Sequence, residues 1–197
     1  FIVDSKNPPN ERVEGILDSL GGPDAKEINF PSMAAFPKTG ASKLVQVRGI
    51  EGEFPFYGVL ETVPVSAANN YQSREAALVD ATVMLQYNLQ AGDSIKVGEV
   101  TFPIAGSLKS IPGSSGLFTS IAPPVVIPYR FIQETGLIQK GSRLDYEFYF
   151  AQPNADLELL EKKLDPILDA EGADLDTHTS TSANLGRRYD NFGKFLN

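Results

Sequence analysis

The chain of 197 residues is long enough to bury a hydrophobic core, as one large domain or two small ones. Its 17 basic and 25 acidic side chains give a formal net charge of −8, which argues against nucleic acid or anionic lipid as the main partner. The absence of cysteine excludes disulfides, thiolate zinc sites and cysteine nucleophiles, and no apolar stretch has the length of a membrane span.

The first residues of the chain predict a strand, a helix and a second strand. Residues 1–5 are apolar and strand-like, and prolines at positions 8 and 9 favour the start of a helix. Apolar residues at helical spacing then run to a pair of glycines, Gly21 and Gly22, which end the helix. Residues 28–36 are predicted to form the second strand.

The same order recurs near the other end of the chain. Residues 144–150 alternate like a strand, and a helical stripe of leucines follows before a strand at 175–181. Pro166 is expected to break or kink this helix, because proline lacks the backbone N–H that the helix needs. Two such repeats indicate an α+β fold in which 1–64 and 144–197 form a split β-α-β layer, with a β-rich subdomain, 65–143, inserted between them.

The insert contains the most consistent local pattern of the chain. Asp80 is a predicted helix N-cap, and a short helix follows whose apolar face is Met84, Leu85 and Leu89, with Gly92 at its end. A two-residue hairpin loop at Gly98-Glu99 then joins two alternating strands. In that register the residue pairs that share one face are Ile95 with Phe102 and Val97 with Val100.

Three further segments of the insert have clear composition signals. Residues 108–118 are rich in glycine, serine and proline and are predicted to be a mobile loop. Residues 121–129 favour a strand, which their prolines should confine to a sheet edge. Residues 131–137 are predicted to form a short helix that ends near Gly136.

The last segment of the chain has the pattern of an amphipathic helix. Its apolar residues are spaced by four, three and four positions, with basic side chains on the other faces; they are Leu185, Tyr189, Phe192 and Leu196, beside Arg187, Arg188 and Lys194. Two interpretations remain open. The helix either docks on the sheet or leads into a membrane span beyond residue 197.

No group of residues reaches the pattern of an active site. His178 is the one histidine, which is a poor basis for a metal site, and Ser114 and Ser115 lack the spacing of a hydrolase nucleophile. Asp93 follows a glycine in a turn, and the pair Asp174 and Asp176 is expected to be solvated on one strand face. We therefore predict no catalytic, cofactor-binding or metal-binding residue and no cofactor.

The order of these motifs resembles the periplasmic core domain of MacB-like, FtsX-family permeases of ABC transporters, and is most similar to YbbP-like permeases. The motifs are Val79-Asp80, the segment from Leu89 to Asp93, Thr135-Gly136-Leu137 and Gly141-Ser142-Arg143. The resemblance covers nearly the whole chain and rests on their order and spacing together.

The resemblance implies a porter-like α/β part formed by both chain ends and a sabre-like β-rich part between them. It also implies transmembrane helices before Phe1 and after Asn197, which place the domain on the periplasmic face of a bacterial inner membrane. Such a domain is not an enzyme. It would transmit movement driven by a cytoplasmic ABC ATPase, and it would contact substrate, a second periplasmic domain or a periplasmic partner protein.

Two further hypotheses remain from other functional classes. An extracytoplasmic ligand-binding or sensor module would show one deep pocket with convergent polar groups. A secreted hydrolase would need a nucleophile and a base within hydrogen-bond reach. Within the permease hypothesis, we expect the loop at 108–118 to be a contact element, since exposed loops often carry function.

Overall fold

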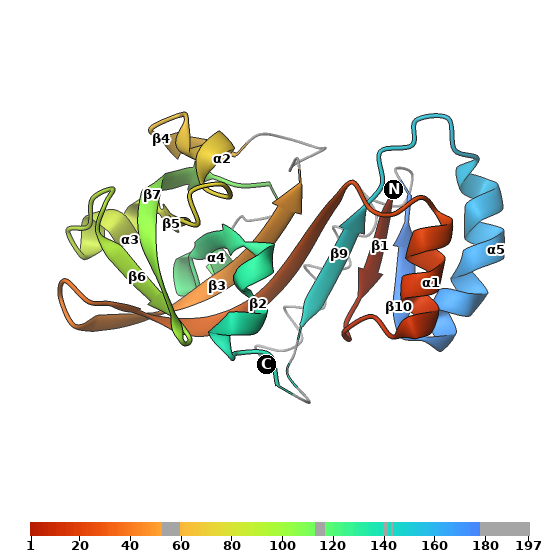
Figure 1. The fold of residues 1–197 in the computed structure, drawn as a ribbon, viewed down its shortest axis with the longest axis horizontal. Coiled ribbons are helices and arrows are strands. Elements are labelled where there is room, and N and C mark those ends of the chain that lie inside the picture. The colour runs from red at the N-terminus through yellow and green to blue at the C-terminus, as the bar shows by residue number, and fades with distance from the viewer. Residues whose placement is uncertain (53–59, 113–116, 140–141, 143, 178–197) are drawn as a thin grey trace. The chain divides into compact units, whose positions relative to one another are not determined.

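The computed structural model describes the chain except for residues 53–59, 113–116, 140–141, 143 and 178–197 (Figure 1). Strands dominate and the helices are short, so the predicted α+β class is confirmed. Two compact units are present. Unit 1 consists of Phe1–Asp24 with the described part of Tyr146–Asn197, and unit 2 is Ala25–Asp145.

This division differs from the predicted boundaries at 64/65 and 143/144. The reason lies in strand pairing, because the long strands β2 (Ala25–Phe36) and β3 (Ala41–Gly52) pair with each other and with strands from the middle of the chain. Alternating sequence alone identifies a strand without telling which strand lies beside it.

Unit 1 is built on a three-stranded antiparallel arrangement with β1 (Ile2–Ser5) at its centre. Its neighbours are β9 (Asp145–Tyr149) and β10 (Ala173–Asp176). The two helices are α1 (Glu11–Ser19) and α5 (Leu157–Ala170). Each helix begins at a polar N-cap, as the sequence favours: the side chains of Asn10 and Asp156 accept hydrogen bonds from the third backbone N–H after them.

Pro166 lies inside α5, and the helix continues through it to Ala170, so the predicted break is wrong. Proline removes one backbone donor, which is tolerable here because Pro166 is exposed to solvent and the helix is anchored by the fully buried Leu168 two residues later. The strand, helix, strand order at both chain ends is otherwise as predicted.

The strands of unit 2 close into a ring by their pairings. In order around the ring these strands are β2, β3, β8 (Pro124–Pro128), β5 (Ala77–Asp80), β7 (Val100–Ser110) and β6 (Ser94–Val97), which pairs with β2 again. The short β4 (Glu61–Val63) pairs with β7 in addition. The short helical elements are α2 (Ala67–Asn70), α3 (Ala81–Gln86), α4 (Leu117–Ile121), η1 (Tyr129–Phe131) and η2 (Gln133–Thr135).

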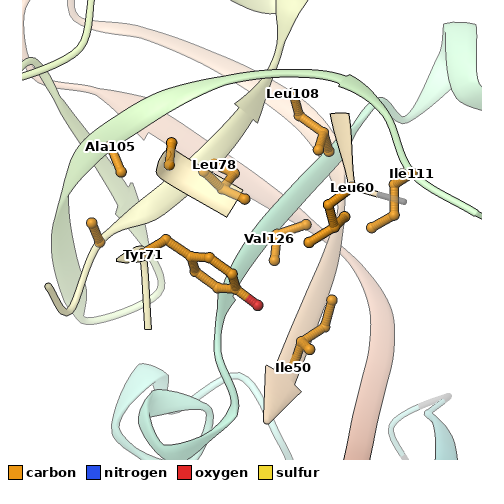
Figure 2. Close-up of a cluster of buried hydrophobic side chains, with 10 residues drawn as sticks. Ile50, Leu60, Tyr71, Leu78, Ala105, Leu108, Ile111 and Val126 are labelled. Carbon is orange, nitrogen blue, oxygen red and sulfur yellow. The ribbon is translucent and has the colours of Figure 1, made fainter. Parts of the chain in front are cut away.

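A cluster of buried side chains fills one part of unit 2 (Figure 2). Its members come from four strands, from α2 and from the segments next to them: Ile50, Leu60, Ala67, Tyr71, Ala76, Leu78, Ala105, Leu108, Ile111 and Val126. Leu108 and Ile111 are therefore core residues, and β7 extends to Ser110. The prediction of a mobile loop that starts at residue 108 is wrong over its first residues, and 113–116 lie outside the described part of the chain.

The strand β8 is internal, which corrects the prediction of an edge strand at 121–129. It pairs in parallel with β3 and antiparallel with β5, and Val125, Val126 and Ile127 are fully buried. Pro124 and Pro128 are its first and last residues. Proline is compatible with the ends of a strand, where a ladder donor is not needed, so these prolines bound the strand without exposing it.

The predicted helix and hairpin of residues 80–104 are confirmed, except that the helix ends at Gln86 instead of near Gly92 and that one residue of its predicted apolar face is exposed. Asp80 caps α3 through Thr82 N at 2.9 Å and Val83 N at 3.3 Å, and β6 and β7 pair in the expected register. Leu85, however, is 83% exposed, while Val83 is fully buried. The helix ends at Gln86, so it is too short for a continuous stripe to define its buried face.

Replacing Gly98 by alanine is expected to destabilise unit 2 by about 1–3 kcal/mol, the usual cost of overpacking. Gly98 has φ of +56°, and a β-carbon there would lie 2.1 Å from the carbonyl oxygen of Thr135. Urea denaturation measures the effect. The control is Gly40→Ala, since Gly40 has a similar φ of +72° but open space around it. An equal loss of stability in both variants would show that backbone strain, and not the clash with Thr135, is the cause.

Candidate functional site

Several of the residues weighed for chemistry lie outside the described part of the chain. These are His178, Ser114 and Ser115. Asp93 is described, and its surroundings show a structural role: its carboxylate accepts from Gln90 N at 2.8 Å and from Lys38 Nζ at 3.1 Å. These contacts lower the pKa of Asp93, chiefly through the backbone hydrogen bond of Gln90 and then through Lys38. Asp93 thus stabilises the turn that precedes β6.

The sequence analysis missed a buried ion pair in unit 2. Arg48 of β3 is 4% exposed and Glu27 of β2 is 1% exposed, and the guanidinium Nε donates to the Glu27 carboxylate. In the β2–β3 register Glu27 faces Ile50, so Arg48 is its diagonal neighbour on the same face. A glutamate and an arginine at alternate strand positions would be taken for solvent-facing residues. The burial of Ile50, which shares this face, shows that the face is interior.

Arg48 also contacts the segment that follows β7. Its Nη1 donates to the carbonyl oxygen of Pro112 at 2.9 Å. Tyr71 lies in the same region, fully buried; burial raises its pKa well above the ordinary tyrosine value. The hydroxyl accepts from Gln72 Nε2 at 3.2 Å. Arg48 thus holds the backbone of the 108–118 segment at Pro112.

A small hollow adjoins this segment. Its volume is about 40 Å³, and its lining residues are Asp80, Leu108, Lys109, Ser110, Ile111, Thr119 and Pro124. Small-molecule sites usually have volumes of roughly 300–1,000 Å³. This hollow therefore does not provide the deep pocket that a ligand-binding module requires. Beside it, α4 presents Leu117 with 85% of its surface exposed.

Carboxylates gather on the strands of unit 1. Asp4 of β1 stands in register opposite Glu147 of β9 and Asp174 of β10, and Asp176 is two residues further along β10. The expectation that Asp174 and Asp176 are both solvated holds for Asp174 alone, since Asp176 is buried. Side chains alternate along a strand, so Asp174 and Asp176 share one face, but the burial of each depends on elements distant in the sequence.

The carboxyl of Asp174 has a raised pKa. The main cause is desolvation, followed by a hydrogen bond with the side chain of Asp169 and by the charges of Asp169, Asp176 and Asp165. Because the folded pKa lies above the unfolded one, protonation of Asp174 stabilises the fold at low pH, and this contribution is lost as the pH rises through the folded pKa.

We therefore expect Asp174→Asn to stabilise the protein slightly at pH 7 and to have no such effect at pH 3. The neutral amide resembles the protonated acid, so it removes the repulsion that develops at higher pH. Since Asp174 is exposed, the gain should stay within about 0.5 kcal/mol, the usual range for surface substitutions. Thermal unfolding at both pH values measures it. A gain of the same size at pH 3 would contradict the proposed cause.

Within the described residues, no helix has the length and apolar character that crossing a membrane requires. No protein-family model matches the sequence. The chain is similar to the uncharacterized ABC transporter permease YbbP of Escherichia coli K12, with 29% identity over 171 residues. The match covers 87% of this chain and 20% of that permease, so the chain spans about a fifth of the length of its relative.

Solved structures share the fold at low sequence identity. The periplasmic region of MacB from Actinobacillus actinomycetemcomitans matches with a TM-score of 0.52 and 12% identity, over 94% of this chain and 92% of that one. The extracellular domain of the noncanonic ABC-type transporter YknZ from Gram-positive bacteria gives 0.55 and 10%, over 89% and 99%. A domain of a permease from Porphyromonas gingivalis gives 0.52 and 13%, over 86% and 82%.

These similarities confirm the resemblance to MacB-like permease domains that was based on the sequence motifs. The chain has the fold of MacB-like periplasmic domains, and its sequence is similar to that of an ABC transporter permease.

Proposed function

We propose that this chain transmits movement across the membrane as the extracytoplasmic domain of an ABC-transporter permease. In this role a cytoplasmic ATPase drives transmembrane helices that flank the domain, and the domain moves in response on the periplasmic side. The observation that carries the proposal is the 29% identity to a permease over 87% of the chain, joined to a fold shared with the periplasmic region of MacB.

The closed strand pairing of unit 2 supports a mechanical role. Its six strands pair in a closed ring, so within the described residues each of them has a neighbour on both sides. A ring with a packed interior and a buried ion pair resists deformation and moves as one body. Three charged groups in unit 2, Asp93, Glu27 and Arg48, make hydrogen bonds that hold its strands and turns in place.

The first test concerns location. The chain is expressed with its natural flanking segments, and Leu85, which is highly exposed, is replaced by cysteine in a sequence that has none. A membrane-impermeant maleimide should label this cysteine in intact spheroplasts as fully as in lysed cells. The matched control is Leu78→Cys, a buried site that should react in neither. Labelling of position 85 only after lysis would place the domain in the cytoplasm and contradict the proposal.

The second test concerns movement. Spin labels at Lys162→Cys in unit 1 and Leu85→Cys in unit 2 report the distance between the two units in the assembled permease and ATPase. Both side chains are exposed, so the labels should leave the fold intact. We expect the distance distribution to change when ATP is bound and to return after hydrolysis. A hydrolysis-deficient ATPase should hold the bound distribution. Identical distributions with and without ATP would contradict mechanotransmission while leaving the location intact.

Substrate contact remains a separate proposal within this role. In the predicted contact region, 108–118, Leu117 of α4 is a described apolar side chain that is exposed, and Ile121, three residues beyond that region on the same helix, is half-exposed. The test replaces both by serine and measures transport by the whole permease. The control replaces Leu85 and Val65, two highly exposed apolar residues elsewhere in unit 2, by serine. Unchanged transport in the first variant would remove α4 from the contact surface.

A further inference from the structure

The segment that carries α4, residues 112–123, contacts β3 at both of its ends. At the first end, Nη1 of Arg48 donates to the carbonyl oxygen of Pro112 at 2.9 Å. At the second end, the backbone N–H of Gln46 donates to the carbonyl oxygen of Pro123 at 3.0 Å. Two alternate residues of one strand, about 7 Å apart, therefore make both contacts.

The two contacts differ in kind. The second belongs to backbone pairing, because β8 begins one residue after Pro123 and runs parallel to β3 over five residues. β8 also pairs with β5 on its other side, so a single substitution does not release it. The first contact is made by a side chain, and a substitution at Arg48 removes it.

The core holds the residue just before the first contact. Ile111 is 3% exposed and belongs to the cluster of Figure 2. Apolar burial is non-directional, so it fixes the place of this side chain without fixing the direction of the next peptide group. A hydrogen bond to a carbonyl oxygen is directional. Arg48 thus supplies an orientation at Pro112 that the core does not supply.

The guanidinium group of Arg48 is itself fixed. Arg48 is 4% exposed, and its Nε donates to Glu27, which is 1% exposed. A guanidinium is a rigid planar fork whose donors keep fixed directions, unlike the single ammonium of lysine. With one nitrogen on Glu27 and another on Pro112, the group ties the direction of the Pro112 carbonyl to strands β2 and β3.

The segment presents an apolar pair to solvent. Leu117 and Ile121 lie four residues apart in α4, so they share one face of the helix, and they are 85% and 50% exposed. A helix of five residues is not stable alone, so its direction depends on how its ends are held. We propose that Arg48 is a positioning residue, which acts through the Pro112 carbonyl to set the direction in which α4 presents this pair.

An apolar pair held in one direction suits an apolar or amphipathic partner, because a surface that is already ordered loses less entropy on binding. This last step rests on the contact role proposed above for α4. The positioning by Arg48 does not rest on it.

The test measures the position of α4 within unit 2 as the distance between two spin labels. The labels are at Ser120→Cys in α4 and Leu85→Cys in α3, both exposed positions in a chain without cysteine. We expect one narrow distance distribution in the parent chain and a broader one in Arg48→Met. The reference pair, Ser42→Cys with Leu85→Cys, should give the same distribution in both chains.

Two variants separate positioning from loss of stability. Glu27→Met with Arg48→Met leaves neither partner of the ion pair in the interior, so it should be more stable than Arg48→Met. It still lacks the donor to Pro112 and should keep the broad distribution. Leu78→Ala weakens the core but keeps the Arg48 contact, so its distribution should stay narrow. Urea denaturation followed by circular dichroism gives the stability of each variant.

Transport by the whole permease connects the positioning to function. The Glu27 and Arg48 double variant should reduce transport as far as Leu117→Ser with Ile121→Ser does. A broad distance distribution with unchanged transport would contradict the contact role of α4 and would still support the positioning by Arg48.

Two outcomes would overturn the inference. The first is a narrow distribution in the double variant, because Arg48 would then act through stability alone. The second is an equal broadening in Leu78→Ala and Arg48→Met, because any loss of stability would then release α4.

Discussion

Replacing Arg48 by methionine is expected to destabilise unit 2 by about 3–5 kcal/mol, the range measured when one partner of a buried ion pair is removed. The variant leaves the Glu27 carboxylate, 1% exposed, without the guanidinium that donates to it. It also removes the donor to the Pro112 carbonyl oxygen. Urea denaturation followed by circular dichroism measures the loss as a lower midpoint.

Two further variants distinguish a buried charge from lost packing. The double variant Glu27→Met with Arg48→Met should be clearly more stable than Arg48→Met alone, because no charge is then left in the interior. Lys26→Met removes an exposed partner of Glu51, at 3.2 Å, and should cost less than about 1 kcal/mol. A single and a double variant of equal stability would contradict the electrostatic explanation.

Leu78→Ala is expected to destabilise unit 2 by about 2–5 kcal/mol. Leu78 lies in β5 and is fully buried in the cluster of Figure 2. Its strand is paired on both sides, with β7 and β8, so the backbone is restrained and cannot easily collapse into the space left by the side chain. Denaturant unfolding at constant m-value measures the loss.

The matched control for this substitution is Leu85→Ala. It is the same chemical change seven residues later, but Leu85 is 83% exposed, so the effect should stay within about 0.5 kcal/mol. A large effect at Leu85 would mean that this side chain is covered in solution by a second copy. A small effect at Leu78 would mean that the ring of unit 2 is less tightly packed than its burial indicates.

Local patterns predicted the elements whose signals lie within a few residues of one another. The Asp80 cap depends on backbone N–H groups two and three positions later, and the hairpin at Gly98-Glu99 depends on a two-residue loop that fixes its register. The strand, helix, strand order at each end also follows from periodicity. Interactions of this kind need no information from distant parts of the chain.

The predictions that were wrong concern residues whose environment is set by contacts with distant parts of the chain. The prolines of β8 suggested an edge strand, yet pairing with β3 and β5 places that strand in the interior. Leu85 suggested an apolar helix face, yet the core lies on the side of Val83. No sequence pattern singled out Arg48 or Glu27, yet the two side chains pair inside unit 2. Each residue was assigned by its own chemistry, while its environment came from strands far away in the sequence.

By itself, the sequence determined the α+β class, the absence of a recognisable catalytic pattern and, through the order of its motifs, the likeness to permease domains. Only the tertiary structure decided that six strands of unit 2 close into a ring, that an ion pair lies inside this unit, and that Asp4, Glu147 and Asp176 of unit 1 are buried. The physical reason is that periodicity encodes which side of a strand is apolar, whereas partner choice depends on contacts between residues tens of positions apart.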